Sequence, residues 1–105
     1  MRICEVLAPE NIIPELKGTT KEEVINELID LFKKDERILD IKEVKESVHE
    51  REKIMSTGIG HGFGIPHCKT NKVTEILAAF GKTKSPIDFE SLDGSPVNLI
   101  FLLIG

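Results

Sequence analysis

The sequence contains no tryptophan or tyrosine and only two cysteines. Cys4 and Cys68 are far apart and form no CxxC pair, which fits a reducing compartment better than a disulfide framework. No signal peptide is recognisable, because Arg2 and Glu5 interrupt the only apolar run near the N-terminus. The longest apolar run, Leu99–Ile104, is too short to span a bilayer. We therefore expect a cytoplasmic protein without direct membrane insertion.

Positively charged residues are also fewer than negatively charged ones. The chain has 14 Lys and Arg against 18 Asp and Glu, a formal net charge of −4. Proteins that bind nucleic acid normally present a basic face, so we expect no nucleic-acid partner. With 40% hydrophobic and 30% charged residues, the composition is that of an ordinary globular protein. A length of 105 residues predicts a single domain, 1–105, with a modest core.

Two capping boxes predict two helices. The first helix begins at Thr19 or Thr20, each of which has a glutamate three residues later. The second begins at Asp40, with Glu43 in the matching position, and runs to about Lys53. Apolar residues follow each box at helical spacing and predict the buried faces. These are Val24, Ile25, Leu28, Leu31 and Phe32 in the first helix, and Ile41, Val44 and Val48 in the second.

Strands are predicted in the C-terminal half of the chain. Glu75–Gly81 is rich in apolar and β-forming residues, and Lys82–Pro86 is interpreted as a polar turn after it. Asp93-Gly94 is a second strong turn signal. Val97–Ile104 is almost wholly apolar, which predicts a strand covered on both faces.

The N-terminal segment is ambiguous in the sequence. Ile3–Leu7 fits either a short strand or a helical turn, and Pro9 and Pro14 bracket what we interpret as an irregular link. Helices interspersed with strands indicate an α/β fold, with helices flanking a sheet.

The stretch from Arg51 to Thr70 is the most informative part of the chain. Glycine occupies every second position from Gly58 to Gly64, which permits left-handed backbone angles and the close approach of a ligand. Consecutive amides there could form a concave nest for an anion. Pro66 stiffens the backbone just before His67. A rigid imidazole beside accessible amides is suited to holding a phosphoryl group.

The order of these residues resembles a known signature. Arg-Glu-x-x-x-Ser-Thr-Gly-Ile-Gly-x-Gly-x-x-Ile-Pro-His is similar to the motif of the fructose/mannitol-type EIIA domain of the bacterial phosphoenolpyruvate-dependent sugar phosphotransferase system. That family includes nitrogen-regulatory paralogues. The likeness continues through Ile87-Asp88-Phe89, Ser91-Leu92-Asp93-Gly94 and Pro96–Phe101, and so covers nearly the whole chain. It implies an α/β fold with a mixed sheet flanked by helices.

The resemblance also implies a reaction. His67 would be the phosphoacceptor of a phosphotransferase component, taking the group from phosphorylated HPr and passing it to a cysteine of an EIIB partner. No metal or organic cofactor would be needed. The family uses Nε2 as the acceptor atom, which requires a carbonyl or carboxylate to hold the other ring nitrogen as a donor.

Other residues of the motif are assigned supporting roles. The guanidinium of Arg51 would stabilise the phosphoryl oxygens, since a planar bidentate donor suits them better than lysine. Otherwise Arg51 is a cation at a helix C-terminus. His61 would line the pocket, and His49 is interpreted as a partly exposed helix residue. The remaining candidates for phosphate binding are Ser56, Thr57, Gly58 and Gly60.

Two alternatives stay open. A nitrogen-branch protein would use phosphorylated His67 as a signal that changes its binding to a target. A metal- or thiol-dependent enzyme would use His61, His67 and Cys68, although their spacing is not a usual zinc pattern. A small buried residue is the simpler interpretation of Cys68.

The sequence departs from the family at its C-terminal end. Family members run to about 150 residues, an ordinary domain size, and carry a second, pocket-lining histidine beyond the strand that matches Val97–Ile104. No residue here occupies that position. We therefore expect a C-terminally truncated domain. Its exposed C-terminal strand would leave an apolar surface and an open sheet edge through which copies of the chain could associate.

Overall fold

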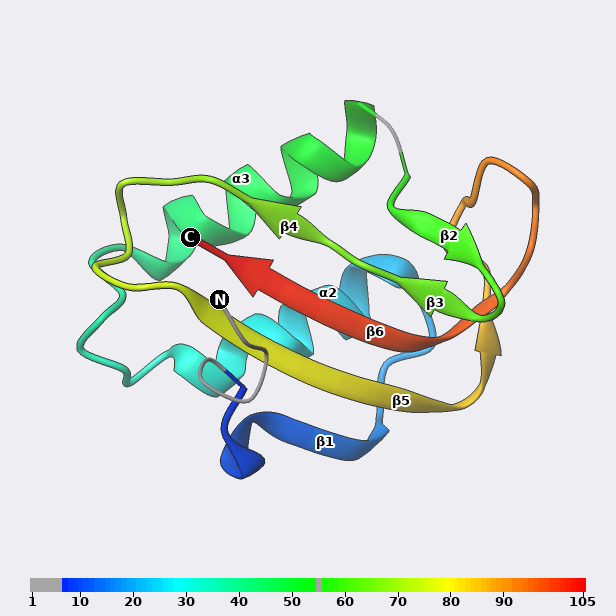
Figure 1. The fold of residues 1–105 in the computed structure, drawn as a ribbon, viewed down its shortest axis with the longest axis horizontal. Coiled ribbons are helices and arrows are strands. Elements are labelled where there is room, and N and C mark those ends of the chain that lie inside the picture. Colours follow the sequence, from blue (N-terminus) through cyan, green and yellow to red (C-terminus); the bar gives the residue numbers. More distant parts are fainter. Residues whose placement is uncertain (1–6, 55) are drawn as a thin grey trace.

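A mixed sheet with helices on one face forms the body of the molecule (Figure 1). The structure, a computed structural model, describes residues 7–54 and 56–105. In Figure 1 the helices α2 and α3 lie behind the sheet. The elements in chain order are η1 (Pro9–Asn11), β1 (Ile12–Leu16), α2 (Lys21–Ile29), η2 (Asp30–Phe32), α3 (Ile41–Ile54), β2 (Gly58–Gly60), β3 (Phe63–Gly64), β4 (His67–Cys68), β5 (Leu77–Ile87) and β6 (Val97–Ile104). The expected mixed α/β fold is confirmed.

The strand β6 lies in the middle of the sheet. It pairs antiparallel with β5 on one side, and parallel with β3 and then β4 on the other. The strand order is β1-β5-β6-β3-β2, with β1 parallel to β5 and β2 antiparallel to β3. Because β6 has neighbours on both sides, the expectation of an open edge at the C-terminal strand is wrong.

The helix α2 begins as its capping box predicts. Thr20 is the N-cap: its Oγ1 accepts from the Glu23 amide at 3.2 Å, and Glu23 Oε1 accepts from the Thr20 amide at 3.2 Å. The predicted apolar face is wrong at Leu31, which is 37% exposed. The α-helix ends at Ile29 and continues as the 3-10 helix η2, whose tighter winding buries Phe32 and turns Leu31 outward.

The helix α3 also follows its prediction, ending one residue beyond the expected Lys53. The Asp40 carboxylate accepts from the Glu43 amide at 3.2 Å, and Val44 and Val48 are fully buried. His49 is half-buried, and burial lowers the pKa of its imidazole. Its Nε2 lies 2.8 Å from Asn26 Oδ1, which joins α3 to α2.

The strand β5 is longer than the sequence suggested. We expected a polar turn at Lys82–Pro86, but the strand begins at Leu77 and continues to Ile87. Within that segment Thr83 is buried, and its Oγ1 donates to the Ser85 carbonyl at 2.7 Å, while its lysine neighbours are exposed. The lysines therefore face solvent from an extended strand, while Thr83 between them points inward.

The irregular link predicted around Pro14 is also wrong. Pro14 lies inside β1, and the pairing of β1 with β5 shifts register between Ile13 and Leu16. An end strand of a sheet tolerates proline because one row of its amides needs no strand partner. The predicted segment Ile3–Leu7 lies outside the described residues except for Leu7, which belongs to no helix or strand.

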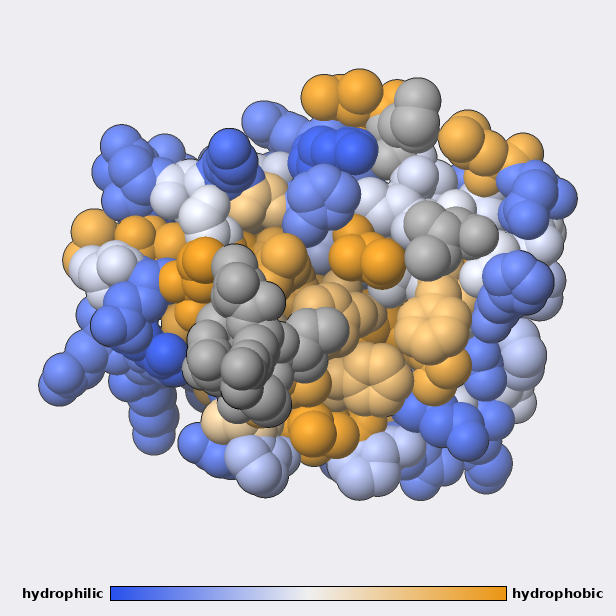
Figure 2. Space-filling model, viewed as in Figure 1, coloured by the Kyte–Doolittle hydropathy of each residue, from blue (hydrophilic) through white to orange (hydrophobic). Residues whose placement is uncertain are grey.

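The core lies between the helices and one face of the sheet. From β6 it takes the fully buried side chains Ile100, Leu102 and Ile104. The alternate residues Leu99, Phe101 and Leu103 are only half-buried, so the prediction that this strand is covered on both faces is wrong. Figure 2 shows the resulting apolar patch across the face turned towards the viewer. Self-association through this face stays a prediction.

Within residues 7–54 and 56–105, every helix falls short of the length and hydrophobicity that a membrane crossing needs.

Candidate functional site

His67 lies on the sheet face opposite the helices. It forms β4 with Cys68, and the two residues pair with Leu103 and Ile104 of β6. Successive side chains of a strand point to opposite faces. Cys68 belongs to the buried core, 9% exposed, while His67 is half-buried on the other face.

A backbone carbonyl orients the His67 ring. Its Nδ1 lies 2.8 Å from the carbonyl oxygen of Ile65. A carbonyl oxygen can only accept, so Nδ1 must carry the proton in this contact. In the neutral ring, Nε2 then keeps its lone pair and is the nucleophilic nitrogen. This is the orienting partner that the sequence could not identify.

The glycine-rich stretch is a β-hairpin and not an open nest of amides. β2 and β3 pair antiparallel, and the chain reverses through His61 and Gly62. Their φ angles are 54° and 81°, and that of Gly60 is 86°. Such angles are uncommon for a non-glycine residue and are typical of tight hairpin turns. The Gly58 amide is bonded to Ser56 Oγ at 3.2 Å, and the Ile65 amide to the Thr57 carbonyl at 3.1 Å.

The hairpin places His61 far from His67. His61 is exposed at the tip, whereas Phe63 and His67 pair with positions on β6 that are four residues apart, about 13 Å along a strand. Zinc–nitrogen bonds are only about 2.0–2.1 Å long. Among the described residues no three His, Cys, Asp or Glu side chains are grouped to hold a metal, so the alternative of a metal site made by His61, His67 and Cys68 is wrong. The role of His61 in lining a pocket stays a prediction.

The Cys68 thiol is in an unreactive setting. Burial raises its pKa to about 11, so the thiolate that would attack a substrate is scarce near neutral pH. The interpretation of Cys68 as a small buried residue is confirmed by its place in the core.

Ser56 and Thr57 use their hydroxyl groups within the protein. Ser56 Oγ donates to the Phe89 carbonyl at 3.0 Å, and Thr57 Oγ1 donates to Glu52 Oε2 at 2.8 Å. Thr57 is buried. These contacts hold the loop between α3 and β2. Because both hydroxyl protons are donated within the protein, neither can also be donated to a phosphoryl oxygen.

Glu52 is the residue that the sequence interpretation missed. Its side chain is only 3% exposed and receives the Thr57 amide at 2.8 Å and Lys21 Nζ at 2.9 Å. The signal was present in the spacing, because Glu52 follows Val44 and Val48 on the buried stripe of α3. A carboxylate at such a position must be paired, so it marks a polar contact inside the protein.

Two glycines of the stretch are required by close packing. A Cβ on Gly64 would lie 2.9 Å from the Phe89 ring, and one on Gly58 would lie 2.1 Å from Ser91 Oγ. Phe89 and Ser91 are both buried, so the segment that follows β5 packs directly on the hairpin. Arg51 lies half-buried in the last turn of α3, next to Glu52.

A family model covers almost the whole chain. Residues 5–105 match the model described as phosphoenolpyruvate-dependent sugar phosphotransferase system, EIIA 2. The "PTS system fructose-specific EIIABC component" of Bacillus subtilis is 40% identical over 98% of the chain, which spans only 16% of that relative.

Two solved structures share the fold. The nitrogen regulatory protein IIA-Ntr from Neisseria meningitidis is 35% identical, with a TM-score of 0.87, and the match covers 95% of this chain and 68% of that one. The enzyme IIA subunit in the complex of enzyme IIAMtl and phosphorylated enzyme IIBMtl from Escherichia coli is 21% identical, with a TM-score of 0.78, over 93% and 70% of the two chains. At that identity the second likeness concerns the fold alone.

Proposed function

The chain belongs to the EIIA type 2 family of the phosphoenolpyruvate-dependent sugar phosphotransferase system, and we propose that His67 is its phosphoacceptor. The observation that carries the proposal is the 2.8 Å contact between His67 Nδ1 and the Ile65 carbonyl. It fixes the tautomer in which Nε2 can attack, and the half-buried position leaves the ring within reach of a partner. Without that contact, the ring would also populate the Nε2–H tautomer, in which Nε2 has no free lone pair for attack.

The transfer needs positioning and charge stabilisation. Nε2 of His67 attacks the phosphorus of phosphorylated HPr; the Nε2–P bond forms as the donor's N–P bond breaks. Nδ1–H stays bonded to the Ile65 carbonyl throughout, which holds the ring in line. A cysteine thiolate of an EIIB partner then attacks phosphorus; the S–P bond forms as the Nε2–P bond breaks, which returns His67 to its neutral state. We propose that this transfer takes place in the cytoplasm.

The proposal predicts one phosphoryl group per chain. The protein, phosphoenolpyruvate, Enzyme I and HPr are incubated together and the intact mass is measured. We expect the mass of a single phosphoryl group to be added, with the label lost in acid and kept in base. Omission of HPr is the control and should leave the mass unchanged. If the full mixture repeatedly fails to phosphorylate the folded protein, the proposal is refuted.

Arg51→Lys is expected to slow this transfer about tenfold, which corresponds to ~1.4 kcal/mol of transition-state free energy. Lysine keeps the charge but cannot donate two parallel hydrogen bonds to phosphoryl oxygens. Rapid-quench labelling measures the rate.

Arg37→Lys is the matched control. Arg37 makes hydrogen bonds of 2.9 and 2.6 Å to the Asp35 carboxylate, on the connection between η2 and α3. The Arg37→Lys variant should be phosphorylated at the same rate as the parent protein. Equal rates for the two variants would remove Arg51 from the proposed mechanism.

A role in the nitrogen branch is the second candidate. It is supported by the 35% identity and the TM-score of 0.87 to the Neisseria nitrogen regulatory protein, although the fructose-specific component is 40% identical. The sugar-branch proposal expects the phosphorylated protein to give up its label to a fructose-type EIIB. Retention of the label in the presence of such an EIIB would favour the regulatory role.

A further inference from the structure

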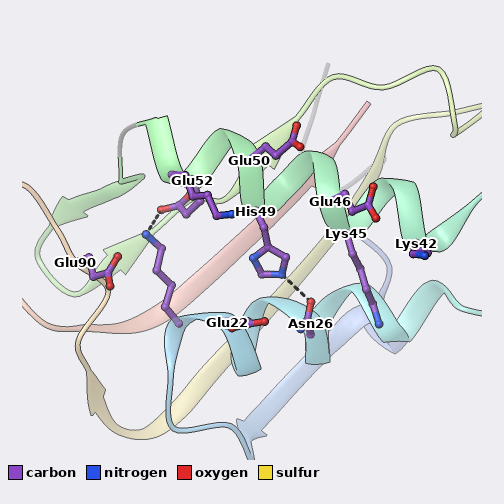
Figure 3. A pocket seen from close by; sticks show the side chains of 11 residues that line it. Glu22, Asn26, Lys42, Lys45, Glu46, His49, Glu50, Glu52 and Glu90 are labelled. Carbon is purple, nitrogen blue, oxygen red and sulfur yellow. Dashed lines mark hydrogen bonds and ion pairs between the residues drawn. The ribbon is translucent and has the colours of Figure 1, made fainter.

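Glu52 joins two helices to the loop that precedes the hairpin. Its Oε1 accepts from Lys21 Nζ at 2.9 Å and from the Thr57 amide at 2.8 Å, and its Oε2 accepts from Thr57 Oγ1 at 2.8 Å. Lys21 comes from α2 and Glu52 from α3, at one end of the groove between these helices (Figure 3). One carboxylate therefore accepts from both hydrogen-bond donors of Thr57, its amide and its hydroxyl.

Hydrogen bonds continue from Thr57 to His67. The Thr57 carbonyl accepts from the Ile65 amide at 3.1 Å, which closes the base of the hairpin. The Ile65 carbonyl accepts from His67 Nδ1 at 2.8 Å. On the other side, the Pro66 carbonyl accepts from the Leu103 amide at 3.1 Å. The orientation of the Ile65 carbonyl is thus determined by Thr57 before it and by Pro66 after it.

We infer that Glu52 is a positioning residue for His67, acting through Thr57 and the Ile65 carbonyl on the tautomer of the imidazole ring. A buried carboxylate is stable only when donors satisfy it, so Thr57 cannot move away without taking two hydrogen bonds from Glu52 and leaving Lys21 to satisfy it. The ring nitrogen that carries the proton is set by the bond that nitrogen makes. Loosening Glu52 therefore loosens the contact that keeps Nε2 unprotonated.

Lys21 supports this arrangement from α2. Its side chain is 14% exposed, and its Nζ also lies 4.9 Å from the centre of the Phe89 ring. Both Lys21 and Glu52 line the groove between the helices, which has a volume of about 630 Å³. Glu50 lines the same groove from the same helix but is exposed (Figure 3). It offers a control with the same change of charge.

The first test compares Glu52→Gln with Glu50→Gln. Protein labelled with ¹⁵N at histidine reports by NMR which nitrogen of each ring carries the proton. We expect a single Nδ1–H form for His67 in the parent protein and in Glu50→Gln. In Glu52→Gln we expect a mixture with the Nε2–H form, because the amide NH2 that replaces one carboxylate oxygen cannot accept the hydrogen bond that Thr57 Oγ1 donates to Oε2. Phosphoryl transfer should fall about tenfold, the lower end of effects seen when an orienting partner is lost.

A second pair of variants guards against misfolding of Glu52→Gln. Thr57→Val removes the hydroxyl link and keeps shape and charge. Thr83→Val makes the same change at another buried threonine, on β5, whose hydroxyl bonds to Ser85. Only Thr57→Val should admit the Nε2–H form of His67, and Thr57→Ser should restore the parent spectrum. A purely structural role would lower the melting temperature of both valine variants and leave the tautomer alone.

The outcomes separate this inference from the proposed function on which its kinetic part rests. An unchanged His67 tautomer in folded Glu52→Gln, or in Thr57→Val if the first variant does not fold, overturns the positioning role. A tautomer that shifts as expected supports it even if the parent protein accepts no phosphoryl group. In that case the proposed function alone is refuted.

Discussion

His67→Gln is expected to abolish phosphorylation by the phosphoenolpyruvate relay. The amide of glutamine can replace a ring nitrogen as a hydrogen-bond donor to the Ile65 carbonyl, but its nitrogen has no nucleophilic lone pair. Because His67 is only half-buried, the fold should be retained. Intact-mass measurement after incubation with Enzyme I and HPr should find no added phosphoryl group, and the circular dichroism spectrum should be unchanged.

His49→Gln is the matched control for that experiment. His49 lies on α3 and contacts Asn26 across the groove, on the helix side of the sheet. The variant should be labelled like the parent protein. If His67→Gln were labelled as fully as this control, another residue would have to be the phosphoacceptor.

Phe89→Ala is expected to lower the free energy of unfolding by about 3–5 kcal/mol. Phe89 has no exposed surface, and its ring lies against the backbone of Gly64 and beneath Lys21 Nζ. Truncation removes these contacts and leaves a cavity under the hairpin. Urea unfolding followed by circular dichroism gives the change, provided that the slope with denaturant stays constant.

Leu92→Ala provides the comparison. Leu92 is three residues along the same segment and 75% exposed, so its truncation should change stability by no more than about 0.5 kcal/mol. A loss below about 1 kcal/mol for Phe89→Ala would mean that the hairpin does not depend on this ring. The packing described between Phe89 and Gly64 would then contribute little.

Local signals in the sequence predicted the helices well. The box of Thr20 and Glu23 needs only residues three apart, and the spacing of Val44 and Val48 marks the face of α3 that becomes buried. The prediction that Leu31 is buried failed because a helix can tighten to 3-10 geometry without any change in the apolar spacing of its sequence. β5 was predicted too short because the lysines and the proline of its second half suggested a turn, although they face solvent from a strand.

The site was harder to predict than the fold. The motif pointed to His67, but the direction of the Ile65 carbonyl depends on bonds to Thr57 and on the pairing of the following residues with β6. The expected nest of amides failed for a related reason, since pairing between β2 and β3 uses the glycine backbone to build a hairpin. Glu52 was visible as a charge on an apolar stripe, but its partners, Lys21 of α2 and Thr57 of the loop before β2, lie in two other parts of the chain.

The pleat of β4 places the imidazole of His67 and the thiol of Cys68 on opposite faces of the sheet. His67 and Cys68 are neighbours in the chain, and imidazole and thiolate are both nucleophiles that can form covalent intermediates. The strand sends one to the open face and the other into the core, where burial raises the thiol pKa to about 11. In the proposed relay, a phosphoryl group on His67 would therefore have no competing acceptor in the adjacent residue and would pass to the thiolate of another protein. The alternation of a single β-strand would thus preserve the direction of transfer.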